Sequence, residues 1–418
     1  MIKKFRYLML LSFWAIFAGF SSMAQERQIN FEHDTWKKIA KKAKAENKLI
    51  FMDCYTSWCG PCKLMAAEVF TQNAVADFFN SNFVNCKFDM EKGEGLELRK
   101  KLPIQFYPTF FLLNSDGTVI HKVVGSSSAD EFIQYFTEGK TDNENYSALE
   151  KHYQSGERNA NFMFKYLRSL RVANEESKET QVATDYFKSL KHEELKNNDM
   201  WLVINYFLND PTSKHFQYMV ENRQFFYNMV GAEVVNSKIR TTYHNALSKQ
   251  LEYYYPESGK PYNKALEDTM IIDLKKYDLP FSKNLLALIY LNKYSKENSW
   301  DNYAEVISAI VRFNLMDNDP ELPETLSSAI SLLIKGTSDP KWLSNVQNWS
   351  QYAIDRESNI GKRALLIENQ ADMLQKIGES QKADEAHKAA KTANDEAEKQ
   401  GKKISVVPMM RLTTGGSH

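Results

Sequence analysis

The chain has 418 residues, 43% of them hydrophobic and 25% charged, which is the composition of an ordinary globular protein and excludes a disordered or fibrous one. Its 53 basic and 53 acidic residues cancel, so it lacks the positive charge of a general nucleic-acid binder, and we expect no nucleic-acid partner. Four cysteines in so long a chain exclude a small disulfide-stapled scaffold, yet all four lie between Cys54 and Cys86.

Residues 1–24 have the order of a secretory signal peptide: a basic start, a mostly apolar run over 7–20, and a small-residue cleavage site that ends at Ala24. An uncleaved membrane anchor is the alternative, but this run is too short for a hydrocarbon core of about 30 Å. No later stretch is apolar enough to span a bilayer. We therefore expect cleavage after Ala24 and an exported, periplasmic protein that is soluble and does not span the membrane. Outside the cytoplasm, thiols are either paired or used in redox exchange.

The region 25–140 is expected to be one domain in which strands and helices alternate. The predicted strands are a short one from Gln28 and four over 48–55, 83–90, 109–113 and 118–124, and the predicted helices cover 36–46, 63–70, 94–102 and 129–137. A turn that ends at Gly117 joins the last two strands as a hairpin. This order predicts a mixed central sheet with helices on its faces.

The motif Trp58-Cys59-Gly60-Pro61-Cys62 follows the strand at 48–55 and resembles the active site of thioredoxin. Residues outside the motif agree with the family pattern: Asp53 before the motif, Lys87 on a neighbouring strand, the segment Tyr107-Pro108-Thr109, and the pair Gly117 and Gly125 in the last hairpin. The resemblance covers about residues 28–138, with departures in the lengths of two loops. It implies an α/β thioredoxin-like domain with a central mixed sheet flanked by helices.

The resemblance also implies a thiol-disulfide oxidoreductase in which Cys59 and Cys62 form the redox disulfide. Cys59 would be the nucleophile, because the N–H groups and the dipole at the start of a helix stabilise a thiolate. Cys62, one turn later and expected to be more buried, would attack the mixed disulfide and release the product. Asp53 would accept the proton of Cys62, with a pKa that burial raises and that Lys87 moderates.

The family pattern implies a substrate-binding surface beside the cysteines, made of Trp58, Gly60, Pro61, Tyr107, Pro108 and Thr109. Pro108 is expected in the cis form, with room for substrate to lie along the adjoining backbone as an added strand. Because Gly60 and Pro61 add no charge, the resemblance to thioredoxin, at about −270 mV, implies a reductant. The partners would then be protein disulfides and a membrane electron donor, while an oxidase or isomerase differs only in potential and partner.

Other interpretations of the cysteines are open. The C-x-x-C pair could be half of a zinc site, but no second Cys/His pair with suitable spacing follows, so we expect no metal and no cofactor. A permanent structural disulfide is possible because export favours oxidation. Strand alternation directs Cys54 and Cys86 away from the active-site face. We expect them to be buried packing residues, and a second redox-sensitive pair is the alternative.

The region 141–400 contains no cysteine and has apolar residues at helical spacing, which predicts an all-helical domain of helical hairpins. The predicted helices cover 161–170, 182–190, 201–208, 215–226, 282–294, 303–313, 323–334 and 342–354. Over 364–397, the small residues Ala371, Gly378, Ala383 and Ala390 resemble the frame of a tetratricopeptide repeat. Residues 401–418 are expected to form a flexible tail.

Two functions are therefore consistent with the sequence. The first is an exported disulfide reductase whose helical domain holds a partner or substrate near Cys59. The second is a binding or chaperone-like scaffold, in which the thioredoxin fold serves for recognition with little turnover. The intact motif favours the reductase, because a purely structural module would need neither Cys59 nor Asp53 nor Pro108.

Overall fold

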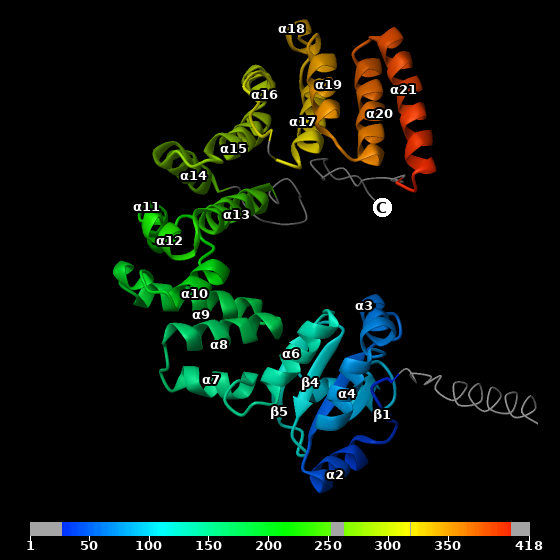
Figure 1. Cartoon of the computed structure of the whole chain (residues 1–418), viewed down its shortest axis with the longest axis vertical. Helices are drawn as coiled ribbons and strands as arrows, with labels where there is room; N and C mark the ends of the chain where they lie inside the picture. The colour runs from blue at the N-terminus through cyan, green and yellow to red at the C-terminus, as the bar shows by residue number, and fades with distance from the viewer. Residues whose placement is uncertain (1–26, 252–262, 318, 403–418) are drawn as a thin grey trace, which may run out of the picture. The chain divides into compact units, whose positions relative to one another are not determined.

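The computed structural model describes residues 27–251, 263–317 and 319–402 (Figure 1). The predicted signal peptide at 1–24 lies outside these residues, as does the greater part of the predicted tail at 401–418. The chain divides into two compact units: the first runs to Lys191 and includes Asp199–Phe207, and the second consists of His192–Asn198 and the residues from Leu208 onward. The predicted domain boundary after residue 140 falls inside the first unit, and it stays a prediction.

The first unit is built on a five-stranded mixed sheet with the order β1-β3-β2-β4-β5. Its strands are β1 (Phe31–Glu32), β2 (Leu49–Tyr55), β3 (Phe83–Asp89), β4 (Thr109–Leu113) and β5 (Val119–Val124). β3 is parallel to both β1 and β2, whereas β4 is antiparallel to β2 and to β5. The predicted mixed sheet with its terminal hairpin is confirmed.

Helices cover both faces of this sheet (Figure 1). They are α2 (Trp36–Glu46), α3 (Gly60–Leu64), the π-helical turn η1 (Met65–Val69), α4 (Asn73–Asn82), α5 (Gly95–Lys101) and α6 (Ala129–Gly139). The sequence did not predict α4, because its Asn, Asp and Ser residues are poor helix formers. Burial of Val75, Ala76 and Phe79 against the sheet outweighs that propensity.

The alternation of β2 separates two hydrophobic layers. Phe51 faces η1, α4 and α6, and its ring centroid lies 4.5 Å from that of Phe79 and 5.1 Å from that of Phe136. Met52 and Cys54 face the opposite layer, where they pack with residues of α2 and α5. Because side chains alternate along a strand, Asp53 shares the face of Phe51, and Cys54 does not.

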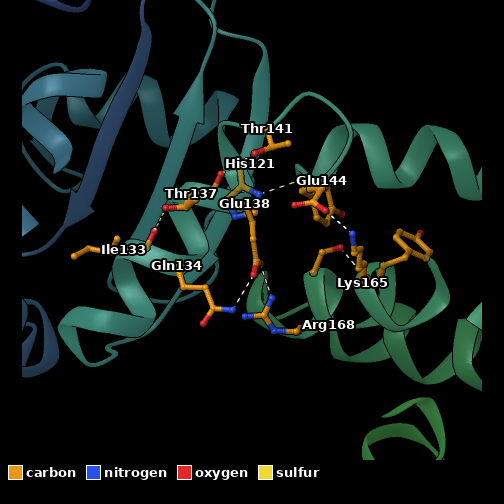
Figure 2. A network of polar contacts seen from close by, with 12 residues as sticks. His121, Ile133, Gln134, Thr137, Glu138, Thr141, Glu144, Lys165 and Arg168 are labelled. Carbon is orange, nitrogen blue, oxygen red and sulfur yellow. Dashed lines mark hydrogen bonds and ion pairs between the residues drawn. The ribbon is translucent and has the colours of Figure 1, made fainter. Parts of the chain in front are cut away.

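The first unit continues into four helices, α7 (Tyr146–Gln154), α8 (Ala160–Val172), α9 (Glu176–Ser189) and α10 (Met200–Phe207). The N–H of Tyr146 at the start of α7 donates a 3.2 Å hydrogen bond to Nδ1 of His121 in β5 (Figure 2). Lys122 of β5, itself buried, forms an ion pair with Glu175 between α8 and α9. These contacts attach the first helices of the helical region to the edge strand of the sheet.

In the second unit, the described residues form helices and connections only. The helices are η2 (His192–Leu195), α11 (Lys214–Glu221), α12 (Arg223–Val230), α13 (Ala232–Leu251), α14 (Lys264–Tyr277), α15 (Ser282–Lys296), α16 (Trp300–Arg312), α17 (Leu322–Gly336), α18 (Pro340–Leu343), α19 (Val346–Arg356), α20 (Ile360–Lys376) and α21 (Ser380–Lys399). The predicted change to a mostly helical structure is therefore confirmed. The single helix predicted over 215–226 is wrong, because Asn222 ends α11 and precedes α12.

The helices α20 and α21 pack side by side as a hairpin. Ala371, Ala383 and Ala390 are fully buried, which fits the close helix contact that the small residues predict. Gly378, in the connection, has a φ of +85°, a conformation that favours glycine. Whether this hairpin is a tetratricopeptide repeat stays a prediction. Across the described ranges, no helix combines the length and the apolar character that crossing a membrane requires.

Candidate active site

Cys59 and Cys62 lie where the chain leaves β2 and enters α3, and a disulfide joins them with a Cα–Cα distance of 5.3 Å. Cys59 is the N-cap of α3, and its sulfur accepts a 3.1 Å hydrogen bond from the N–H of Cys62. Pro61 in the first turn has the backbone angle of a helix and needs no N–H partner there. A sulfur at this position is close to the partial positive charge of a helix start, which favours a thiolate after reduction.

The burial of the two cysteines differs from the expectation. Cys59 is 3% exposed and Cys62 is 8% exposed, so the predicted deeper burial of Cys62 is not found. In the disulfide form the two sulfurs are bonded to each other and share one environment. Gly60 and Pro61 between them are exposed, and a Cβ at Gly60 would meet no atom within 4 Å. The surface in front of the disulfide is therefore open to a partner.

Asp53 lies on β2 before the motif, and its carboxyl group is buried. Its Oδ1 atom has no hydrogen-bond partner among the described residues. Burial raises the pKa of Asp53 to about 7, while the nearby positive charge of Lys87 acts in the opposite direction. A carboxyl group that gains and loses a proton near neutral pH can exchange protons with a thiol.

Lys87 is the neighbour of Asp53 across the β2–β3 ladder, so both predicted residues share one face of the sheet. The Lys87 side chain is exposed, and its ammonium lies 5.1 Å from the ring centroid of Phe31. It acts on Asp53 through space, which is the moderating effect that the sequence predicts. The sequence did not indicate the contact with Phe31, since that residue lies far away along the chain.

Trp58 forms an apolar rim beside the disulfide and is 64% exposed. Its indole N–H donates a 2.9 Å hydrogen bond to Oε2 of Glu91, and its ring lies edge-on to Tyr107 at a centroid distance of 6.1 Å. The sequence did not indicate Glu91 as a residue of the site. It follows β3 in a loop whose length departs from the family pattern, so no motif marked it.

The segment Tyr107-Pro108-Thr109 leads into β4, and the Tyr107–Pro108 peptide bond is cis. Thr109 pairs with Cys54 of β2 on one side and with Val124 of β5 on the other. The C-terminal ends of β2 and β5 and the N-terminal end of β4 therefore meet at one edge of the sheet. Together with the ring contact between Trp58 and Tyr107, this register brings the predicted substrate-binding residues to the side of the disulfide.

Cys54 and Cys86 lie in a different environment. Both are free thiols, fully buried in the layer that contains Ile39, Ala43 and Leu98. Burial raises the pKa of each thiol well above its ordinary value, so each is held in the neutral form. This placement agrees with the prediction of packing residues and does not add either sulfur to the site.

One group of possible metal ligands lies elsewhere in the described part of the chain. Glu368 and Asp372 of α20 and His387 of α21 bring their ligand atoms within 4.8 Å of one another. Exposed acidic groups are common without an ion, and Nδ1 of His387 already contacts Oε1 of Glu368 at 3.2 Å. They lie in the second unit, whereas the cysteine pair lies in the first.

The site thus contains a cysteine pair at a helix start, a buried carboxyl group and an open apolar rim. A family model described as a thioredoxin-like domain matches residues 36–140. Thioredoxin H4 of Arabidopsis thaliana is 35% identical over 109 residues, and thioredoxin-1 of Drosophila melanogaster is 34% identical over 109 residues. Each match covers 26% of this chain and 87% or 88% of the relative. A solved structure of a putative disulphide-isomerase from Bacteroides thetaiotaomicron is 46% identical, covers 28% of this chain and 96% of that one, and has a TM-score of 0.26.

Proposed function

This chain belongs to the thioredoxin-like family and is a thiol-disulfide oxidoreductase, and we propose that it reduces disulfides of proteins outside the cytoplasm. The observation that carries this proposal is the pair Cys59 and Cys62 at a helix start, on the strand-to-helix connection that follows Asp53. The two residues between the cysteines carry no charge that would stabilise the thiolate further and make the disulfide a strong oxidant.

The proposed reaction begins with the reduced protein. The Cys59 thiolate attacks one sulfur of a substrate disulfide, which forms a mixed disulfide and releases the other substrate sulfur as a thiolate. Cys62 gives its proton to the Asp53 carboxylate and attacks the sulfur of Cys59. The substrate leaves with two thiols, and the protein is left with the Cys59–Cys62 disulfide that the structure contains. Two electrons pass from the protein to the substrate.

Export and an electron supply are parts of the same proposal. The order of charge, apolar run and small residues in 1–24 supports export with cleavage after Ala24. A reductant in an oxidising compartment must be reduced again after each turnover, so we infer a membrane electron donor that supplies two electrons to the disulfide. N-terminal sequencing of the protein recovered from cells tests the first part: retention of 1–24 would contradict it.

Two measurements on the full mature chain test the reductive direction. The reduced protein should reduce insulin, and the Cys62→Ser variant should accumulate substrates bound through Cys59, which mass spectrometry identifies. The reduction potential should lie near that of thioredoxin, at about −270 mV. A potential above about −150 mV would instead indicate an oxidase, because such disulfides are strong oxidants.

A further inference from the structure

A cavity of about 460 Å³ lies within the first unit, between the C-terminal end of β5 with the loop after it and the helices α6, α8 and α10. Val124, Gly125 and Ser127 line it from the sheet side, and Phe164, Arg171 and Tyr206 line it from the helices. The sequence placed these two groups in separate predicted domains. We call this space the β5–α8 cavity.

The β5–α8 cavity begins beside the active-site edge of the sheet. The N–H of Gly125 donates a 2.9 Å hydrogen bond to the carbonyl of Pro108, and Val124 pairs with Thr109. Pro108 and Thr109 belong to the segment along which substrate backbone is expected to lie. A peptide extended past that segment toward β5 therefore approaches Val124 and Gly125, which line the cavity.

Aromatic and aliphatic side chains make one part of the wall, and serine, glutamate, glutamine and arginine residues make the rest together with Gly125. The ring of Phe164 lies 5.7 Å from that of Tyr206 and 6.2 Å from that of Phe207, in edge-on contacts. The Arg171 guanidinium lies 4.5 Å from the ring centroid of Phe207. Tyr206 is 48% exposed, so the aromatic wall is accessible from solvent.

The two arginines of the cavity are already bound to carboxylates. Arg168 forms an ion pair with Glu138 of α6, as Figure 2 shows, and Arg171 forms one with Glu179 of α9. Because both arginines are paired with carboxylates, neither offers a full positive charge to an anion, and the aromatic side chains provide a surface for apolar contact. Ser127 contributes a buried hydroxyl that has no hydrogen-bond partner among the described residues.

We propose that the β5–α8 cavity binds a large apolar or aromatic side chain of the substrate protein, a few residues from the cysteine that reacts with Cys59. The helices α8 and α10 thereby select substrates for the thioredoxin-like site. This inference rests on the proposed function and adds a substrate preference to it. An extended peptide advances about 3.3 Å per residue, so two to four residues cover roughly 7 to 13 Å.

The test uses peptides whose single cysteine is a mixed disulfide with thionitrobenzoate. Phe or Ala is placed two, three or four residues before or after that cysteine, and the reduced full-length protein is mixed with each peptide. Cys59 attacks the peptide sulfur, thionitrobenzoate leaves as a coloured anion, and Cys62 then releases the peptide thiol. The initial rate of colour release gives the rate constant.

At the best position, the Phe peptide should react about tenfold faster than its Ala counterpart, as expected for burial of one large apolar side chain. The variants Phe164→Ala and Tyr206→Ala should each reduce this ratio below about threefold. Ser126→Trp, which fills the cavity from an exposed position, should do the same. Leu202→Ala is the matched control, because Leu202 is an exposed residue of α10 outside the cavity lining.

The outcomes separate the two proposals. All variants should keep the wild-type rate with the symmetric disulfide of thionitrobenzoate, because this probe has no peptide chain that could extend along the segment from Tyr107 to Thr109. A wild-type protein that reacts with this probe but treats Phe and Ala peptides alike at every position overturns the cavity proposal. So does a preference that survives in Tyr206→Ala and Ser126→Trp. A wild-type protein inert toward every disulfide overturns the proposed function itself.

Discussion

Two pairs of cysteines lie in the same small domain and have opposite chemistry. Cys59 and Cys62 lie at the edge of the sheet, where a helix begins and a partner can approach, and they form a disulfide. Cys54 and Cys86 lie inside the layer covered by α2 and α5, where both remain free thiols. All four cysteines are close together along the chain, so their different reactivity comes from where the fold places each of them.

Two consecutive residues of β2 belong to the two different environments. Asp53 faces the layer of Phe51, and the next residue, Cys54, faces the opposite layer. Burial raises the pKa of both groups, but with different results. A carboxyl group with a pKa of about 7 can exchange protons at neutral pH, whereas a thiol raised well above its ordinary pKa is held as an inert neutral group.

The largest expected effect is loss of exchange when the edge pair is broken. Cys59→Ser should lower the rate of insulin reduction by at least about 1,000-fold, because a hydroxyl does not replace a thiolate as the attacking nucleophile. The matched control is Cys86→Ser in the interior pair, which should keep nearly the full rate per folded molecule. Equal losses in the two variants would show that the division between edge and interior is wrong.

Removal of the proposed proton acceptor, Asp53, should have the next largest effect. Asp53→Asn keeps the shape of the side chain but accepts no proton, so the rate of release from the mixed disulfide should fall about 100-fold at pH 7. In the wild-type protein that rate should rise with pH through the Asp53 pKa of about 7 and then level off. Stopped-flow measurement between pH 5.5 and 8.5 checks both results, and an unchanged pH profile in the variant would contradict the role of Asp53.

The same carboxyl group makes stability depend on pH in a direction that is easily tested. Between the ordinary Asp pKa of 3.8 and the folded pKa of about 7, the unfolded chain releases a proton that the folded chain keeps. The free energy of unfolding should therefore fall as the pH rises through this window. Asp53→Asn removes that loss, so it should stabilise the protein by on the order of 4 kcal/mol at pH 8 and by less than about 1 kcal/mol at pH 4. Urea titrations at the two pH values measure the difference.

The interior pair should show its role in stability instead of activity. Cys86→Ala removes one buried sulfur, which should lower the free energy of unfolding by about 1 kcal/mol while insulin reduction stays normal. In the wild-type protein, iodoacetamide should modify Cys54 and Cys86 only after denaturation, because both are fully buried. Rapid modification in the folded state would revive the alternative of a second redox-sensitive pair.

Much of the edge region, by which we mean β2, the Cys59–Cys62 motif and the segment from Tyr107 to Thr109, could be predicted. The patterns that mark it lie within a few residues of one another along the chain. The motif at Cys59, the strand before it, Pro108 and the glycines Gly117 and Gly125 of the last hairpin depend on short spacings along the chain. The predicted ranges of β2, β3 and β4 agree with the structure to within a residue or two. Turns and helix caps depend on the types of a few neighbouring residues, so they can be predicted from one sequence alone.

What could not be predicted depends on contacts between distant residues. The helix α4 has weak propensity and is stabilised by packing against the sheet. The β5–α8 cavity combines residues of β5 and α8 that no motif connects. Likewise, α13 contains β-branched residues and has little separation of polar and apolar faces, so its spacing did not indicate a helix.

The smallest expected effect concerns Glu91, the residue of the edge region that the sequence did not indicate. Glu91→Ala removes the acceptor for the Trp58 indole N–H, which should leave the exposed ring free to turn away from Tyr107. The bond is exposed, so its loss should cost less than about 1 kcal/mol, and the rate with peptide disulfides should fall two- to fivefold. Glu97→Ala on α5 is the matched control, since Glu97 contacts Lys100 and not Trp58. If the two variants reacted at the same rate, Trp58 would be an apolar rim whose orientation does not affect exchange, and the edge region would need only its cysteines and Asp53.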